Sequence, residues 1–359
     1  MAYTIIDDAS EYFQCKKWTG TGGQQAVTYD STTDHATDWI WHKEPADTNG
    51  WHQADSTEAS ALSKWLASDN TNAQYSTGAY VAGVDANGIT YAGGDSSFNS
   101  ANTAQCTWSW HINGGTNVNN TVGTGIDSVV QVSQTAGIST VQYDGDGTQS
   151  GRTVGHGLGA VPTMIISKDR DSTSNVPHWR VYHVGIGNTK YLSLSETSAQ
   201  STFNDWDNTS PTSTVYSVGG AGGYTPTNTN NTEYKAWLFA DVQGYSKHGK
   251  YIGNGGADGV FVYTGFKPAF LMWKRADATG DWRMVDNKNG VNGAIPRMKV
   301  NSNTAQGSAG DNVDLVSNGF KHRSTSASSN AANSLYVYMC FAENPLVTSG
   351  GVPSCASGL

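Results

Sequence analysis

The amino-acid sequence predicts an all-β protein made of three tandem antiparallel β-sandwich domains of a jelly-roll-like type. Thr, Val, Tyr and Trp are common, whereas the helix formers Leu, Glu and Lys are scarce. The 359 residues include 42 glycines, which supply turns between short apolar runs such as TVYSV (214–218). A pattern of four blocks also recurs three times with a period of about 100 residues, longer than the units of solenoid proteins.

Each copy of the pattern begins with an aromatic residue and a Gly-rich turn: WTGTGG (18–23), YDGDGT (143–148) and YIGNGG (251–256). At near-constant distance follows a short apolar run that ends in a lysine, at Lys43, Lys168 and Lys274. We interpret each hexapeptide as a tight turn in which glycine supplies a positive φ, because no phosphate-loop motif or βαβ pattern surrounds it.

Two more blocks follow each lysine in the same order. The first contains a tryptophan, at Trp51, Trp179 and Trp282. The second ends in a glutamine, at Gln74, Gln200 and Gln306. Each copy then closes on an aromatic-rich strand, over residues 106–112, 233–240 and 335–342. Because each repeat is long enough to hold its own core, we expect three domains, with the recurring tryptophans in their cores.

The repeats divide the chain into six segments. We expect an N-terminal arm (1–13), a divergent first repeat that is a candidate docking domain (14–112) and a polar linker (113–136). The second repeat (137–243), the third repeat (244–345) and a C-terminal tail (346–359) follow. Within the linker, SVVQV (128–132) is a candidate strand that docks on the second repeat.

One short helix is expected in the first repeat. Asp55 and Glu58 have the spacing of a capping box, and Leu62, Trp65 and Leu66 would then share one helical face with Ala59.

The charge and the cysteines limit the classes of function. Only 14% of the residues are charged and the net charge is −9, which argues against a nucleic-acid partner. No apolar run approaches the roughly 18 residues that span a bilayer, and the N-terminus lacks the pattern of a signal peptide. The four cysteines form no CxxC pair, so we expect free thiols and no zinc site, although Cys15 and Cys106 could become neighbours.

No residue pattern predicts catalysis, a metal or a cofactor. DGDG (144–147) lacks the remaining ligands of a calcium loop, and no GxSxG elbow is present for a serine nucleophile. Carboxylates for glycosidic cleavage could come from Asp205, Asp207 or Asp241, but acidic residues in this chain lie mostly in turns. We therefore expect a protein that is not an enzyme.

Binding is the better prediction, through aromatic residues in loops that the repeats do not share. Trp206 lies between Asp205 and Asp207, and Tyr224 lies in a Gly-rich loop. An exposed Trp206 could stack on a sugar while the two carboxylates accept its hydroxyl protons. The alternative is that Trp206 folds back and covers an edge of the core.

Long segments of the chain resemble a known family. HGLGAVPTMIISKDRDS, YHVGIGNTKYLSL, WLFADVQGYSKHGKYIGNGGADGVFVYTGFKPAFLMWKR and YVYMCFAENPLVTSGGVPS are similar to the repeated C-terminal domains of tail-fibre-like proteins of tailed bacteriophages, especially marine ones. The resemblance is strong over residues 137–353 and weak over 14–112. It implies a structural protein on the virion surface, assembled in the host cytoplasm, and gives no residue-level site.

Three functions remain open at this point. The first is adhesion to the host envelope, through a surface glycan or protein, as a tail fibre or related fibre. The second is a capsid or tail decoration without a receptor, and the third is a polysaccharide depolymerase. The expected partners are other virion proteins and further copies of the chain, since such fibres are commonly trimeric. Repeated weak sites on an oligomer would then gain affinity by avidity.

Overall fold

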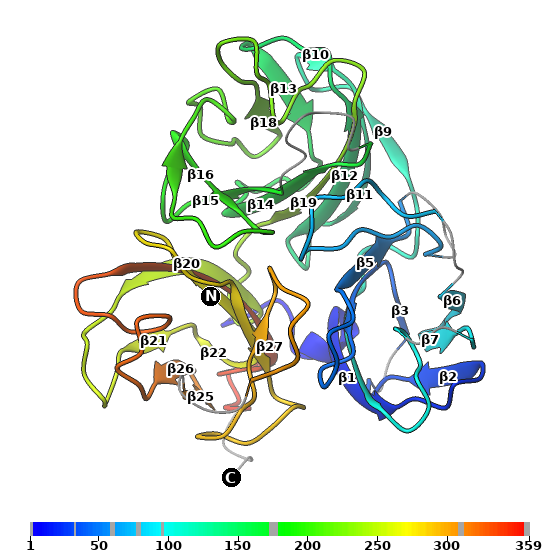
Figure 1. Cartoon of the computed structure of the whole chain (residues 1–359), viewed down its shortest axis with the longest axis vertical. Helices are drawn as coiled ribbons and strands as arrows, with labels where there is room; N and C mark the ends of the chain where they lie inside the picture. The colour runs from blue at the N-terminus through cyan, green and yellow to red at the C-terminus, as the bar shows by residue number, and fades with distance from the viewer. Residues whose placement is uncertain are drawn as a thin grey trace.

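Three pairs of β-sheets surround a common centre, one pair from each sequence repeat (Figure 1). The computed structural model describes residues 3–31, 34–57, 62–76, 80–94, 97–171, 179–307 and 312–354. The prediction of an all-β protein with sandwich-like domains is confirmed.

The first repeat follows a single turn of 3-10 helix, η1 (Ala9–Glu11). Its larger sheet has the strand order β1-β8-β4-β5 and its smaller sheet the order β2-β7-β3, with β6 paired to β7. The strands are β1 (Phe13–Thr19), β2 (Gln25–Thr28), β3 (His35–Ala36), β4 (Trp39–Lys43), β5 (His52–Asp55), β6 (Val81–Asp85), β7 (Asn87–Tyr91) and β8 (Ala104–Trp110).

The second repeat has the largest sheet of the molecule, in the order β17-β16-β15-β14-β19-β12-β11-β9, and a smaller sheet in the order β10-β13-β18. The strands are β9 (Val118–Asn120), β10 (Gly125–Ile126), β11 (Ser128–Ser133), β12 (Ile138–Asp144), β13 (Arg152–Gly155), β14 (Met164–Asp169), β15 (Arg180–His183), β16 (Lys190–Ser193), β17 (Ser201–Thr202), β18 (Val215–Val218) and β19 (Glu233–Phe239).

The third repeat has sheets in the orders β20-β27-β22-β23-β24 and β21-β26-β25. The strands are β20 (Ser246–Ile252), β21 (Phe261–Tyr263), β22 (Phe266–Arg275), β23 (Arg283–Asp286), β24 (Met298–Lys299), β25 (Val313–Val316), β26 (Gly319–His322) and β27 (Leu335–Pro345). Each larger sheet therefore contains one common order of four strands, in which the strand before the Gly-rich turn pairs with the last strand of the repeat: β1 with β8, β12 with β19 and β20 with β27.

The Gly-rich hexapeptides form the turn that leaves the first strand of each repeat. The second glycine of each hexapeptide has a positive φ, of 74°, 77° and 69° at Gly22, Gly147 and Gly255, as predicted. A buried asparagine holds each turn, because its side-chain oxygen accepts the backbone N–H of the middle residue at 2.9–3.0 Å. These are Asn99 for Thr21, Asn228 for Asp146 and Asn330 for Asn254.

A single apolar core joins the three repeats. Trp39 and Trp110 stack with ring centroids 4.0 Å apart, and Trp39 lies 5.7 Å from Trp237 of the second repeat. Phe239 of the second repeat and Phe341 of the third lie 6.1 Å apart. The sequence predicts a separate core for each repeat. The first and second repeats have one, but the core of the third belongs to the shared core, so the repeats are not independent units.

The segment 113–136, which we expected to be a polar linker, instead contributes strands to the second repeat. β11 pairs antiparallel with β12, as the apolar run at 128–132 suggested, and β9 pairs with β11. β10 pairs parallel with β13 of the smaller sheet. A segment rich in Asn and Thr can form these strands because its backbone completes the edges of two sheets, which the polar composition alone does not reveal.

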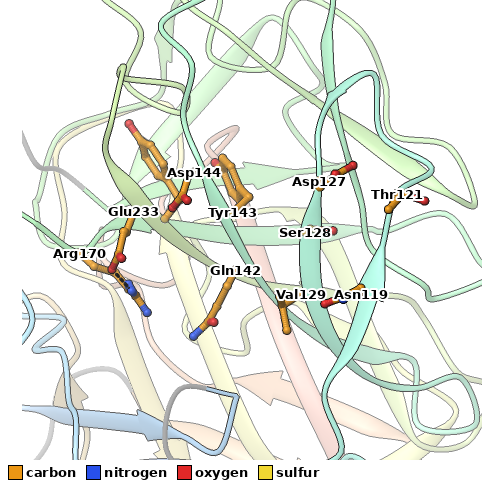
Figure 2. Close-up of a pocket in the computed structure, with 11 residues that line it drawn as sticks. Asn119, Thr121, Asp127, Ser128, Val129, Gln142, Tyr143, Asp144, Arg170 and Glu233 are labelled. Atoms are coloured by element: carbon orange, nitrogen blue, oxygen red, sulfur yellow. Dashed lines mark hydrogen bonds and ion pairs between the residues drawn. The ribbon is translucent and has the colours of Figure 1, made fainter.

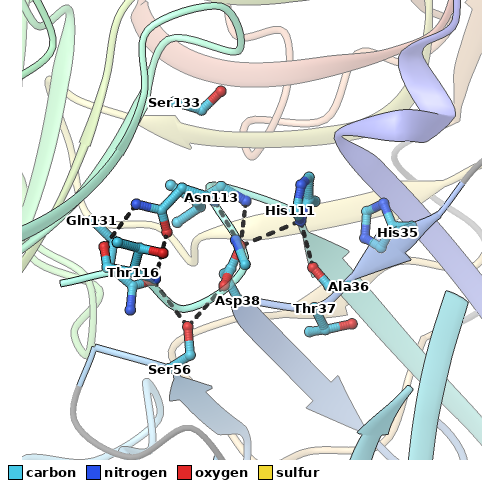
Figure 3. A network of polar contacts seen from close by, with 12 residues as sticks. His35, Ala36, Thr37, Asp38, Ser56, His111, Asn113, Thr116, Gln131 and Ser133 are labelled. Atoms are coloured by element: carbon cyan, nitrogen blue, oxygen red, sulfur yellow. Dashed lines mark hydrogen bonds and ion pairs between the residues drawn. The ribbon is translucent and has the colours of Figure 1, made fainter. Parts of the chain in front are cut away.

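A buried carboxylate fixes the beginning of this segment against the first repeat (Figure 3). Asp38 accepts backbone N–H groups of Ile112, Asn113 and Gly114 at 2.6, 2.9 and 3.0 Å. Ser56 Oγ lies 2.9 Å from both the Asp38 carboxylate and Gln131 Oε1 of β11. Polar side chains therefore connect the first repeat to the added strand.

The helix expected in the first repeat is not formed in the part that the structure describes. Leu66 pairs with Gln53 and Trp65 with Tyr75 as isolated β-bridges, while Glu58 and Ala59 lie outside the described residues. The Asp55 carboxylate accepts the N–H of Thr57 at 3.0 Å, and Ser56 and Thr57 lie in a turn. Leu62, Trp65 and Leu66, which suggested a helical face, pack in the apolar cores instead.

The cysteine thiols of the described chain are free and buried, at Cys15, Cys106 and Cys340, whereas Cys355 lies outside the described residues.

We expect the protein to lose stability as the pH falls from about 6.5, the ordinary pKa of histidine, towards 4. Burial lowers the pKa of five histidines, to about 3 or about 4 in four of them: His35, His42, His52, His156 and His183. The unfolded chain then binds more protons than the folded one, so each histidine removes about 1.4 kcal/mol per pH unit.

Several groups oppose this loss, among them His111 and Asp205. Asp38 raises the pKa of His111, and burial raises the pKa of Asp205 to about 6, so both bind protons more readily in the folded state. Thermal unfolding measured between pH 7.5 and 4.5 tests the net effect, and His156→Gln is expected to flatten the slope by about one proton. A midpoint that does not fall in this range would contradict the expectation.

Candidate functional site

The three lysines that end the apolar runs lie at joints between the repeats. Lys43 Nζ donates to Asn303 O of the third repeat at 3.4 Å, Lys168 Nζ to Thr71 O of the first at 3.4 Å, and Lys274 Nζ to Thr197 O of the second at 3.1 Å. Each ammonium group also donates to a carbonyl of its own repeat. Burial lowers the pKa of all three to about 8.

The recurring tryptophans and glutamines complete the same joints. Trp51 Nε1 donates to Lys299 O at 2.9 Å, Trp179 Nε1 to Ala67 O at 3.1 Å, and Trp282 Nε1 to Ser193 O at 2.8 Å. The backbone N–H of each glutamine donates across the joint as well, from Gln74 to Arg170 O, Gln200 to Ala276 O and Gln306 to Pro45 O. The first repeat thus contacts the second, the second the third and the third the first.

The residues that the repeats share therefore connect the three repeats into a closed ring. Little of the surface of these residues remains free to contact a ligand. Each shared tryptophan is fully buried and hydrogen-bonded to the neighbouring repeat.

Trp206, which we predicted as a sugar-stacking residue, cannot have that role because it is buried. Only 1% of its surface is exposed, and its ring lies 5.8 Å from that of Tyr182 in the core of the second repeat. Burying the large indole between the two sheets of the repeat is favourable, and this outweighs its position in a polar loop. The alternative interpretation of Trp206 is correct.

The structure brings Asp205 and Tyr224 together around Arg180. The Arg180 guanidinium lies 3.5 Å from the Asp205 carboxylate, donates to Tyr224 Oη at 3.2 Å and stacks 4.0 Å from the ring centroid of Tyr191. Asp205 is fully buried, and burial raises its pKa to about 6 although Arg180 opposes that shift. This cluster holds the loop in place and presents no open carboxylate.

Asp207 has a local structural role. Its φ is 47°, and its carboxylate accepts the backbone N–H of Gly151 at 2.7 Å. The four predicted contact residues therefore do not form one exposed site.

An open groove lies at the outer end of the larger sheet of the second repeat (Figure 2). Its volume is about 450 Å³, and its residues come mainly from β9, β11, β12 and β19. Most of its lining is polar, with amide, hydroxyl and carboxylate groups of Asn119, Thr121, Asp127, Ser128, Gln142, Asp144 and Glu233, together with Val129, Tyr143, Arg170 and Tyr234. Because β9 and β11 have no counterpart in the other repeats, this groove is specific to the second repeat.

The groove has more acidic than basic side chains. Asp144 lies directly opposite Glu233 on the neighbouring antiparallel strand, and Glu233 forms an ion pair with Arg170. Partial burial and then the charges of Glu233 and Asp171 raise the pKa of Asp144. Such a surface disfavours polyanions and suits a neutral ligand that offers hydroxyl groups.

The sequence signal that could have revealed the groove is the Asn- and Thr-rich insertion before the second repeat. Asn119 and Thr121 belong to it, and the other two repeats lack a comparable segment. The side chains on β12 and β19 gave no signal, because they are ordinary polar residues on strands. Arg180 was missed because its partners Asp205 and Tyr224 are distant in sequence.

Within the described residues, no helix is long and apolar enough to cross a membrane, and no group of three or more His, Cys, Asp or Glu side chains is arranged to hold a metal ion. A family model described as a domain of unknown function, DUF7483, matches residues 8–345. No curated protein matches the chain. No solved structure matches it either.

Proposed function

The chain belongs to the DUF7483 family, whose function is unknown. We propose, from its resemblance to tail-fibre-like proteins and from the groove of its second repeat, that it is a non-catalytic adhesion protein on the surface of a tailed-phage particle. The family match extends over all three repeats and agrees with a ring that acts as one unit. The proposed partners are other particle proteins, further copies of the chain and a glycan of the host envelope.

The observation that carries the adhesion proposal is the groove of the second repeat. Its amide groups can both donate to and accept from sugar hydroxyls, and its carboxylates can accept from them. Gln142 lines the groove, and its side-chain Nε2 is buried without a hydrogen-bond partner among the described protein groups. The ring holds the strands of the groove rigidly, which lowers the entropic cost of binding.

A glycan array probed with an oligomerised form of the full chain tests this proposal. We expect binding to neutral, hydroxyl-rich glycans, with Gln142→Ala weakening it about tenfold through the loss of one well-placed group. Gln149→Ala is the matched control, because Gln149 is an exposed glutamine of the same repeat outside the groove. Absence of binding by the wild-type oligomer would overturn the receptor function and favour a decoration protein.

A depolymerase is the second candidate, and the pairing of Asp144 with Glu233 favours it. Residues directly opposite on antiparallel strands have Cβ atoms about 5 Å apart, and a retaining glycosidase needs two carboxyl groups at about that distance. Incubation of the bound glycan with the protein separates the two functions. Cleavage that disappears in both Asp144→Asn and Glu233→Gln would establish an enzyme, whereas binding without cleavage supports adhesion.

A further inference from the structure

A second cavity lies where the two ends of the described chain meet the third repeat. It has a volume of about 510 Å³ and lies between the N-terminal arm, the strands β20 and β21, and the residues that follow β27. We call it the chain-end cleft and define it by Tyr3, Asp241, Lys247, Tyr263 and Leu346. It shares no lining residue with the groove of the second repeat.

Two exposed tyrosines line this cleft. Tyr3 is 57% exposed and Tyr263 is 54% exposed, whereas nearly all large aromatic side chains of the described chain are buried or half-buried. Two exposed aromatic rings on one cavity are typical of a ligand site. Phe261, another exposed aromatic residue, lies on the same strand as Tyr263 but does not line the cleft.

Hydrogen bonds hold the backbone near each tyrosine in place. Next to Tyr3, the buried Thr4 donates from Oγ1 to Gln243 O at 2.9 Å. Farther along the arm, the carboxylate of Asp7 accepts the N–H of Ser349 at 2.6 Å, which ties the arm to the residues after β27. Tyr263 pairs with Gly319 in the sheet. The two rings are therefore held near the cleft before any ligand arrives.

A hydrogen-bond acceptor and a hydrogen-bond donor complete the wall of the chain-end cleft. The Asp241 carboxylate is fixed by His248 Nδ1 at 3.0 Å and by Thr163 Oγ1 at 3.0 Å, and its side chain remains 40% exposed. Lys247 Nζ lies 5.7 Å from the ring centroid of Tyr263 and donates to Tyr263 O at 3.3 Å. One fixed acceptor, one ammonium donor and two aromatic rings are together the groups that recognise a sugar ring.

We propose that the chain-end cleft is a second saccharide-binding site, in which a pyranose ring stacks on Tyr263 or Tyr3 and its hydroxyls bond to Asp241 and Lys247. The opposite charges of Asp241 and Lys247 favour a neutral sugar over a polyanion. A lipid chain would leave both charged groups unsatisfied. The proposal for the cleft depends on different residues from the proposal for the adhesion groove, so an experiment can exclude either site without excluding the other.

Saturation-transfer NMR on the full chain, with methyl α-glucoside, methyl α-mannoside and methyl β-galactoside as probes, tests this proposal. We expect transfer to the ring protons of at least one probe, reduced about tenfold in Tyr263→Ala, in Tyr3→Ala or in both, since stacking supplies much of the affinity. Tyr263→Phe keeps the ring and is expected to keep most of the transfer.

Phe261→Ala removes an exposed ring outside the cleft, and Gln142→Ala alters only the groove. Both variants are expected to retain the transfer that depends on Tyr263. The proposal is overturned if wild type shows no transfer to any probe, or if transfer is unchanged in Tyr3→Ala and Tyr263→Ala. Loss of transfer in Gln142→Ala alone would place the sugar in the groove and would also overturn it. Because Tyr263 is exposed, thermal unfolding of its variants should match wild type, which separates binding from folding.

Discussion

Lys235→Val is expected to lower the free energy of unfolding by about 3–5 kcal/mol, because it leaves a buried carboxylate without its partner. The ammonium group of Lys235 in the second repeat forms an ion pair with Asp55 of the first, and both side chains are buried. Burial lowers the pKa of Lys235 to about 8, with Asp55 opposing that shift, so the lysine is still mostly charged at pH 7. Loss of the charge would weaken the joint between two repeats.

Valine is a suitable replacement because the third repeat has one at the matching place. Lys235 pairs with Lys168 across the sheet, as Val337 pairs with Lys274 and Cys106 with Lys43. The double variant Asp55→Leu with Lys235→Val removes both charges and is expected to recover most of the lost stability. Urea unfolding gives the free energies for all variants. A loss below about 1 kcal/mol in Lys235→Val would mean that the pair is solvated and does not hold the joint.

The ion pair between Lys235 and Asp55 also shows how much of the structure the sequence repeats predict. The spacing of Lys43, Lys168 and Lys274 identified three related units from sequence alone, and the alternation of short apolar runs identified their strands. Sequence spacing did not show that each lysine reaches a neighbouring repeat, because a residue used in a joint is conserved between copies just as a core residue is. The closed ring therefore appeared only in the structure.

Local sequence misled where tertiary packing decided the outcome. Trp206 lies between two aspartates in a polar loop, yet its ring fills space between two sheets. The Leu62–Leu66 segment has helical spacing, yet Trp65 and Leu66 pair with strand neighbours. In both cases the burial of a large apolar side chain outweighs the preference of its surroundings, and no window of adjacent residues contains that information.

The groove was hidden for a different reason. Its polar side chains come from strands that are far apart in sequence, and the insertion that supplies β9 and β11 has the composition of a linker. The sequence indicates that an extra segment precedes the second repeat. It does not indicate where this segment pairs, because that depends on the free edge of β12. Edge pairing of backbone groups needs no particular side chain.

Trp39→Ala is expected to destabilise the whole molecule by about 3–5 kcal/mol, because it opens a cavity in the core that the repeats share. The Trp39 ring lies 4.0 Å from Trp110 in its own repeat and 5.8 Å from Phe239 in the second, which in turn lies 6.1 Å from Phe341 in the third. If the ring of repeats unfolds as one cooperative unit, the loss must reach strands that Trp39 does not touch.

Hydrogen exchange provides the decisive measurement, because it reports each strand separately. Amides of β20 and β27 in the third repeat are expected to lose as much protection as those of β4 and β8 in the first. Trp18→Ala is the control, because Trp18 is only partly buried and stacks on Tyr91 within the first repeat, so a loss of about 1 kcal/mol is expected. Faster exchange confined to the first repeat in Trp39→Ala would show three domains that fold separately. The rigidity that we assign to the groove would then lack its physical basis, since that rigidity requires the first and third repeats to hold the second in place.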